Sequence, residues 1–167
     1  MNLHVNLDDV LFLDIETVPE YERWEDVSEV NQKLYEQKTA YQRKEEISAE
    51  DFYERAGIWA EFGKIICISV GYFTLSESKK QFRVTSFYGD DEKVLLEQFK
   101  VLLDTHFYKS QQLLCAHNGK EFDFPYISRR MLIHQIDLPK KLNLFGKKPW
   151  EVPHLDTMEL WKFGDYK

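Results

Sequence analysis

Hydrophobic and polar positions change in short blocks along the first part of the chain, and these blocks predict β-strands. An apolar run at 10–15 is interrupted only by Asp14 and stops before Pro19, which is typical of a buried strand. Two further β-favouring runs, at 64–73 and 81–88, are separated by a short polar turn. The three segments therefore predict a meander of neighbouring strands.

The second half of the chain combines helical and strand patterns. Apolar residues recur at helical spacing after an acidic start at 90–92, which predicts an amphipathic helix. A second helix is predicted at about 124–135, with Asp123 as its N-cap and Pro125 in its first turn. The remaining expected elements are strands at 111–116 and 154–157 and the start of a last helix at 158–163.

Strands that lead into helices after an initial meander predict an α/β fold, in which helices flank a central mixed sheet. The length of 167 residues is close to the size at which one hydrophobic core is well supported. We therefore expect a single domain that covers the chain from 1 to 167.

The segment at about 20–55 differs from its surroundings in composition. It is rich in acidic and basic residues, contains no glycine, and spaces its few apolar residues as a helix would. We interpret it as a mostly helical insert that follows the first strand and lies outside the sheet. A charged, solvated helical face is the simpler interpretation, and a lid over a substrate cleft is the alternative.

Composition and charge narrow the class of protein. With 43% hydrophobic and 31% charged residues, the chain has enough apolar material to form a packed globule. The net charge of −7 disfavours a protein that coats nucleic acid by electrostatics alone, although an enzyme that holds phosphates through metal cations escapes this objection. Cys67 and Cys115 lie in apolar runs and are expected to be reduced core residues. Neither a signal peptide nor a spanning segment is recognisable, so we predict a cytoplasmic protein without membrane contact.

The first strand ends in Asp14-Ile15-Glu16-Thr17, which carries two acidic side chains. Residues two apart on a strand point to the same side, so Asp14 and Glu16 project together from one face. Two carboxylates so close repel each other unless a cation lies between them, and hard divalent cations prefer oxygen ligands. A pair of carboxylates at a strand end, partly in water, is the alternative interpretation.

A further acidic position lies where a strand leads into a helix, in the segment from His117 to Asp123. A carboxylate at a helix N-terminus is kept ionised by the helix dipole and by backbone N–H groups, which suits a metal ligand. Plain N-capping is the commoner role of an isolated Asp at such a place. For Asn118 in the same segment, turn-making and substrate contact are equally compatible with the pattern.

Taken together, Asp14-x-Glu16 on the first strand and Asn118-x-x-x-Phe122-Asp123 at a strand-to-helix junction resemble two motifs of a known family. They resemble the first and second motifs of the DEDD (DnaQ-like) 3′-5′ exonuclease superfamily, and in particular predicted exonucleases related to the proofreading domain of family B polymerases. The resemblance covers nearly the whole chain. It implies a ribonuclease H-like fold and a metal-dependent 3′-5′ exonuclease that hydrolyses phosphodiester bonds of nucleic acid.

The same resemblance implies roles for individual residues. Two divalent cations, Mg²⁺ or Mn²⁺, would be held by Asp14, which bridges both, by Glu16 on the side of the attacking water, and by Asp123 on the other ion. Two such cations can activate a water and stabilise the leaving oxygen of an in-line phosphodiester cleavage. The substrate would be a single-stranded 3′ end, and by resemblance its contacts would be Thr17, Asn118 and Phe122.

The last motif of the family, Tyr-x-x-x-Asp or His-x-x-x-x-Asp on a later helix, has no counterpart at the matching place in the sequence. Trp161 and Asp165 have the spacing but lack the phenol or imidazole. By resemblance, Asp156 is a structural acid that supports the ligands rather than the fourth ligand itself. We therefore expect a chain that is truncated before the last helices of the fold and is poorly active in this form.

Two other functions compete with this hypothesis. Asp14-Ile15-Glu16-Thr17 is a variant of the Asp-x-Asp-x-Thr loop of haloacid dehalogenase-like phosphatases, but the third residue differs and the segment from Asn118 to Asp123 is then unexplained. A non-catalytic nucleic-acid or protein-binding module that retains the fold is the alternative of a different class. The early clustered acids argue against it, because a purely structural domain has little use for them.

Basic residues gather between Lys120 and Trp150, where seven of them stand against three acidic ones. Together with the aromatic residues Phe145 and Trp150, this excess could follow a phosphate backbone and stack bases. An ordinary solvated loop explains the pattern equally well. The histidines have no partner spacing that suggests zinc.

Overall fold

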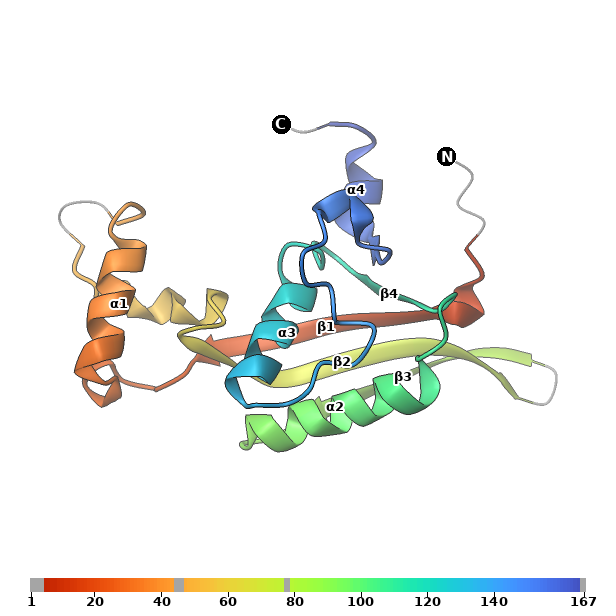
Figure 1. Ribbon diagram of the computed structural model, residues 1–167, viewed down its shortest axis with the longest axis horizontal. Helices are drawn as coiled ribbons and strands as arrows, with labels where there is room; N and C mark the ends of the chain where they lie inside the picture. Colours follow the sequence, from red (N-terminus) through yellow and green to blue (C-terminus); the bar gives the residue numbers. More distant parts are fainter. Residues whose placement is uncertain (1–4, 44–46, 77–78, 166–167) are drawn as a thin grey trace.

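The computed structural model describes residues 5–43, 47–76 and 79–165, and its centre is a five-stranded sheet (Figure 1). The strands are β1 (Val10–Pro19), β2 (Gly63–Ser76), β3 (Lys79–Tyr88), β4 (Leu113–Ala116) and β5 (Leu155–Asp156). Their order in the sheet is β3-β2-β1-β4-β5. The first three strands pair antiparallel as a meander, whereas β4 is parallel to β1 and β5 is parallel to β4. The predicted α/β fold with a central mixed sheet is confirmed.

Two of the helices cover one face of this sheet. α2 (Glu92–His106) and α3 (Asp123–Ile133) both contact β2 and also contact each other (Figure 1). α4 (Thr157–Lys162) follows β5, and α1 (Glu29–Thr39) lies beyond the end of β1. The remaining helical turns are 3₁₀ helices, which are η1 (Leu7–Asp9), η2 (Trp24–Asp26), η3 (Tyr53–Ile58) and η4 (Pro149–Glu151).

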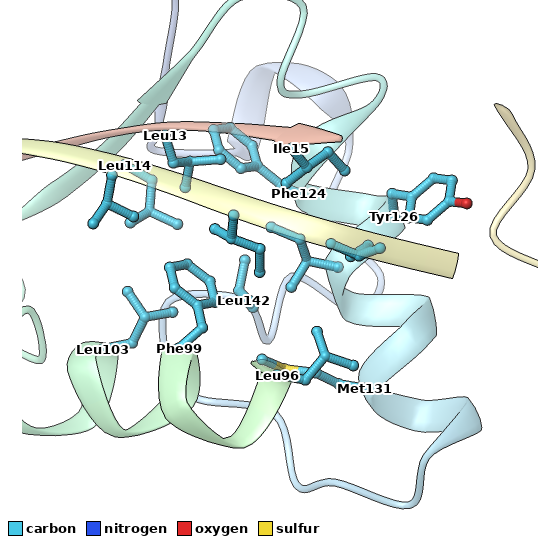
Figure 2. Packing of buried hydrophobic residues seen from close by; sticks show 14 of the residues in the cluster. Leu13, Ile15, Leu96, Phe99, Leu103, Leu114, Phe124, Tyr126, Met131 and Leu142 are labelled. Atoms are coloured by element: carbon cyan, nitrogen blue, oxygen red, sulfur yellow. The ribbon is translucent and has the colours of Figure 1, made fainter. Parts of the chain in front are cut away.

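The main hydrophobic core lies between the sheet and α2 with α3 (Figure 2). Alternate residues of β1, Leu13 and Ile15, point into this core. Phe99 of α2 and Phe124 of α3 are fully buried beside them. Their burial removes a large apolar area from water, so this contact fixes both helices on the sheet.

The opposite face of the sheet carries the acidic residues of β1. Asp14 and Glu16 are exposed, and their register partners on β2 are Ser69 and Cys67. Directly opposed residues of antiparallel strands share a face, so these four side chains lie on the same side of the sheet. Most of β3 is exposed as well. The acids are therefore accessible from this side.

The segment predicted as an insert has an aromatic core of its own. It contains η2, α1 and η3, and the sheet includes none of its described residues. Tyr35 of α1 is fully buried, and its hydroxyl donates to the carbonyl of Phe52 at 2.7 Å. Rings of Trp24, Tyr53, Trp59 and Phe62 meet the Tyr35 ring edge to face. α1 therefore packs one side against these rings, while Glu29, Lys33 and Glu36 are exposed on another side.

Some boundaries also differ from the prediction. β1 continues two residues beyond Thr17, to Pro19, because the long strand β2 provides a ladder for its whole second half. Both cysteines are free, and burial raises the pKa of the Cys115 thiol to about 11. Among the described residues, no helix has the length and apolar character that crossing a membrane would require.

Candidate active site

A β-bulge follows the two acidic residues of β1. The register between β1 and β2 shifts between Glu16 and Thr17, and Ile66 of β2 is the extra residue. Next to it, the N–H of Ile65 donates to Glu92 Oε1 of α2 at 2.7 Å. Bulges bend a strand and redirect its side chains, and they are common beside active sites. This bulge therefore shapes the end of β1 that carries the predicted acids.

Asp123 is the first residue of α3 and turns toward β1. The predicted N-cap role is wrong, because the N-cap is Phe122 and the Asp123 carboxylate instead accepts the backbone N–H of Ile15. Asp123 is only 3% exposed. Burial, with smaller effects from the charges of Asp14 and Asp156, raises the pKa of Asp123 to about 6. The N–H groups of Ile15 and of Asp123 itself oppose this shift.

Asp14 and Asp123 together form what we call the acid pair. A cation between them would relieve their repulsion, and carboxylate oxygens are the donors that Mg²⁺ and Mn²⁺ prefer. Glu16 is exposed on the same strand face as Asp14. Within residues 5–43, 47–76 and 79–165, however, no group of three or more His, Cys, Asp or Glu side chains is arranged to hold a metal ion. The acid pair thus fits part of a divalent-cation site, and the ligand roles of Asp14, Glu16 and Asp123 stay predictions.

Asp156 organises the turn that precedes α3. Its carboxylate accepts the backbone N–H groups of Asn118 at 2.9 Å, Lys120 at 3.1 Å and Met158 at 2.9 Å. Asp156 is the last residue of β5 and is 4% exposed. Through these three hydrogen bonds Asp156 fixes the turn at 118–120.

Asn118 shapes the same turn from the other side. Its φ of 63° lies in the left-handed region, which Asn tolerates better than most residues. Its carbonyl oxygen accepts the N–H of Phe122 at 2.9 Å. Asn118 and Asp156 also line a pocket of about 590 Å³, together with Lys120, Trp150 and Lys162. The turn that precedes α3 therefore opens onto a cavity.

Thr17 and Phe122, the other predicted substrate residues, both contact Tyr126 of α3. Thr17 hydrogen-bonds to the buried phenol of Tyr126, which donates to the carbonyl of Gly57 at 2.8 Å. The ring centroids of Phe122 and Tyr126 are 5.3 Å apart. Through Gly57 these contacts join α3 and β1 to η3.

A buried ion network lies about two turns along α3 from Asp123, and the sequence analysis did not identify it. Arg130 of α3 is 2% exposed, and it donates to both carboxylate oxygens of Glu92, to Glu20 and to the carbonyl of Ala60. His134 Nε2 lies 2.7 Å from Glu92 Oε2. The signal was present in the sequence, because Arg130 falls on the apolar face of the helix next to Met131. A buried arginine at such a position requires carboxylate partners.

Another buried polar cluster fastens the loop after α3 to β4. His154 accepts the N–H of Leu114 at its Nδ1, 3.2 Å away, so its Nε2–H donates to the carbonyl of Lys141 at 2.7 Å. Burial lowers the pKa of His154 to about 4. The Lys141 ammonium in turn donates to the carbonyls of Lys109 and Gln112. His154 is therefore a neutral structural residue here.

Comparisons with known proteins identify a family that matches the chain. A family model described as the RNase_H superfamily matches residues 51–165, a range that contains Asn118, Asp123 and Asp156 and leaves out β1. Among solved structures, the chain is similar to the family B DNA polymerase from the hyperthermophilic archaeon Pyrobaculum calidifontis, with 17% identity and a TM-score of 0.41. That similarity covers 77% of this chain and 11% of the polymerase chain. A comparison with curated proteins found no match.

Proposed function

Because the chain belongs to the RNase_H superfamily, we propose that it is a metal-dependent 3′-5′ exonuclease that hydrolyses phosphodiester bonds of nucleic acid by a two-metal mechanism. One observation carries the proposal. Asp123, inside the matched range, is buried, and burial together with the nearby charge of Asp14 raises its pKa to about 6. Carboxylates held together in this way are costly to a fold, so they favour a role in binding cations.

The chain's own residues would position the metal and the substrate. Asp14 and Asp123 would hold the divalent cations, with Glu16 as a further ligand on the exposed face of β1. When bound, such cations polarise the phosphodiester and lower the pKa of the attacking water. The N–H of Ile15 would keep the Asp123 carboxylate in its orientation.

The substrate would be a single-stranded 3′ end. Asn118, in the turn that Asp156 fixes, would contact the substrate from the wall of the pocket, and Thr17 and Phe122 would do so beside the acids. Asp156 would act through this turn rather than on the metal.

A second candidate is a non-catalytic nucleic-acid or protein-binding module of the same fold. It is favoured by one specific observation, which is that the described residues contain no group of three or more ligands arranged for a metal ion. A module of this kind would bind its partner in the absence of any cation.

A nuclease assay tests the proposal. A single-stranded oligonucleotide labelled at its 5′ end would be incubated with the protein and Mn²⁺, and a second sample would contain EDTA. We expect slow stepwise shortening from the 3′ end, and only with Mn²⁺. Asp14→Asn and Asp123→Asn should each reduce the cleavage rate by more than about 100-fold. Removing a residue that only supports a metal ligand costs at most about 100-fold, so a larger loss indicates a direct ligand.

Asp137→Asn is the matched control, because Asp137 is exposed beyond the end of α3. Its activity should equal that of the unmodified protein. Equal activity of Asp14→Asn would contradict the two-metal mechanism. Binding without any cleavage, equally strong with EDTA, would favour the binding module instead.

A further inference from the structure

The loop between α3 and η4, residues 138–150, is called the lysine loop here, because it contains four lysines and no acidic residue. Lys141 is buried and bonded to carbonyl groups, whereas Lys140, Lys147 and Lys148 are exposed. Two aromatic side chains of the loop are also open to solvent, Phe145 at 97% and Trp150 at 77%. Exposed rings among unpaired positive charges are unusual for a plain solvated loop in an acidic protein.

The lysine loop borders the pocket at the candidate site. Pro149 and Trp150 line the pocket of about 590 Å³ whose wall also contains Asn118 and Asp156. The ammonium of Lys148 lies 5.3 Å from the centre of the Trp150 ring. This arrangement places an aromatic plane and a cation at a pocket that reaches the turn before Asp123.

Two of the three acidic residues of this pocket, Asp156 and Glu159, are already bonded, and the third is the exposed Glu121. Glu159 pairs with Lys120 at 2.7 Å, and Asp156 accepts three backbone N–H groups. Lys162 also lines the pocket. The pocket wall therefore carries two lysines against three carboxylates, and the excess of positive charge lies in the lysine loop beside it.

A second hollow of about 360 Å³ continues this surface between α3 and the lysine loop. It shares Lys120, Glu121, Pro149 and Glu159 with the first pocket, so the two adjoin. Its lining is mostly apolar, and its basic residues, apart from the shared Lys120, are Arg129 and Lys147. Apolar side chains can pack against the bases of a nucleic-acid strand, and the scattered cations can bind its phosphates.

We propose that the two pockets and the lysine loop form a track that binds a single strand of nucleic acid upstream of its 3′ end, with Trp150 stacking on a base and Lys147 and Lys148 holding phosphates. The inference rests on the proposed function, because the track leads to the turn that precedes Asp123. A single strand is the expected occupant, since its unpaired bases can stack on a ring such as Trp150 while a duplex keeps its bases covered.

Binding is measured by fluorescence anisotropy of a labelled oligonucleotide of about ten nucleotides, a length within the range of known single-strand sites. EDTA is present so that no cleavage occurs. Trp150→Ala should weaken binding about fivefold to 150-fold, the loss that accompanies one base–aromatic stack, and Trp150→Phe should restore most of it. The double variant Lys147→Ala/Lys148→Ala should reduce the salt dependence of log K by about 1.4, because each phosphate contact to a single strand contributes about 0.7.

Matched controls come from the same chain. Trp161 is 79% exposed on α4 and lines neither pocket, so Trp161→Ala should bind as the unmodified protein does. Lys93→Ala/Lys109→Ala removes two exposed lysines outside the track and should lower the salt dependence by less than the loop double variant. Equal effects of the loop variants and these controls would overturn the track.

Other outcomes separate the track from the proposed function. Competition by polyglutamate as effective as competition by an unlabelled oligonucleotide would overturn the track in favour of an acidic peptide partner. Absence of any oligonucleotide binding by the unmodified protein would overturn it too. Weaker binding by the loop variants, with no cleavage by any form of the protein, would support the track and refute the exonuclease. Cleavage that depends on Asp14, with unchanged binding in the loop variants, would support the exonuclease and refute the track.

Discussion

Replacing Arg130 tests directly how much the buried ion network stabilises the fold. It is buried in α3 at 2% exposure and binds Glu92, whose own side chain is 5% exposed. Replacing Arg130 by Met keeps a long apolar stem but removes every guanidinium donor. Glu92 is then left as a buried carboxylate whose main counter-charge is gone.

The expected loss can be estimated from the partners that remain. Breaking a buried ion pair by removing one partner costs about 3–5 kcal/mol. Glu92 still accepts the N–H of Ile65 at 2.7 Å and still contacts His134 at 2.7 Å. We therefore expect a decrease of about 3 kcal/mol in the free energy of unfolding for Arg130→Met, near the lower end of that range.

Urea denaturation followed by circular dichroism measures this change, and the slope with urea checks that the unfolding stays two-state. Arg129→Met is the matched control, because Arg129 is exposed on the same helix and should change stability by less than about 0.5 kcal/mol. The double variant Glu92→Met/Arg130→Met should be more stable than Arg130→Met alone, since it removes the buried carboxylate of Glu92 together with its counter-charge. A loss below about 1 kcal/mol for Arg130→Met, or equal stability of the single and double variants, would refute this account of the network.

Further predictions concern pH, packing and the turn before α3. The pKa of His154 is lowered to about 4 from 6.5, so its stabilising effect is complete above pH 6.5 and is lost as the pH falls toward 4; between pH 7 and 5 the unfolding free energy of the unmodified protein should fall by about 2 kcal/mol relative to that of His154→Gln, which shares every other titrating group. Gly63→Ala should destabilise by more than about 2 kcal/mol in thermal unfolding, because its new Cβ would lie 2.8 Å from backbone, whereas Gly71→Ala meets only the movable ring of Phe82 and should cost clearly less. Asp156→Asn should cost about 1–3 kcal/mol, because its amide N–H₂ cannot accept the N–H groups that the carboxylate accepts.

Periodicity was enough to predict the layout of the sheet and the two covering helices. The alternation around Asp14 correctly places Leu13 and Ile15 in the core and leaves the acids on the other face. Such patterns are local, because each strand or helix must bury one side whatever its partners are. The strand order and the parallel addition of β4 and β5 are consistent with the α/β class that the pattern predicts.

The parts that sequence reasoning missed depend on contacts between distant segments. Asp123 looks like an N-cap by every local rule, yet its carboxylate accepts the N–H of Ile15, a donor that only the fold brings near. Tyr35 lies in a strongly charged segment, and its burial depends on rings such as Phe62, far along the chain. Charge content alone cannot distinguish a solvated helix from one that packs a single aromatic side.

The acid pair and the ion network are linked by the helix they share. α3 is anchored near its start, where Asp123 accepts the N–H of Ile15, and again at Arg130, where Glu92 and Glu20 hold the guanidinium. The two anchors are about 10 Å apart along the helix at 1.5 Å per residue. Because Glu92 also accepts the N–H of Ile65 beside the bulge, a shift of α3 away from β1 would break bonds at both anchors at once. The Asp123 carboxylate, whose pKa is raised, can therefore stay near Asp14 despite the repulsion between the two charges. The stability that holds it there comes from buried residues that do not touch the candidate site.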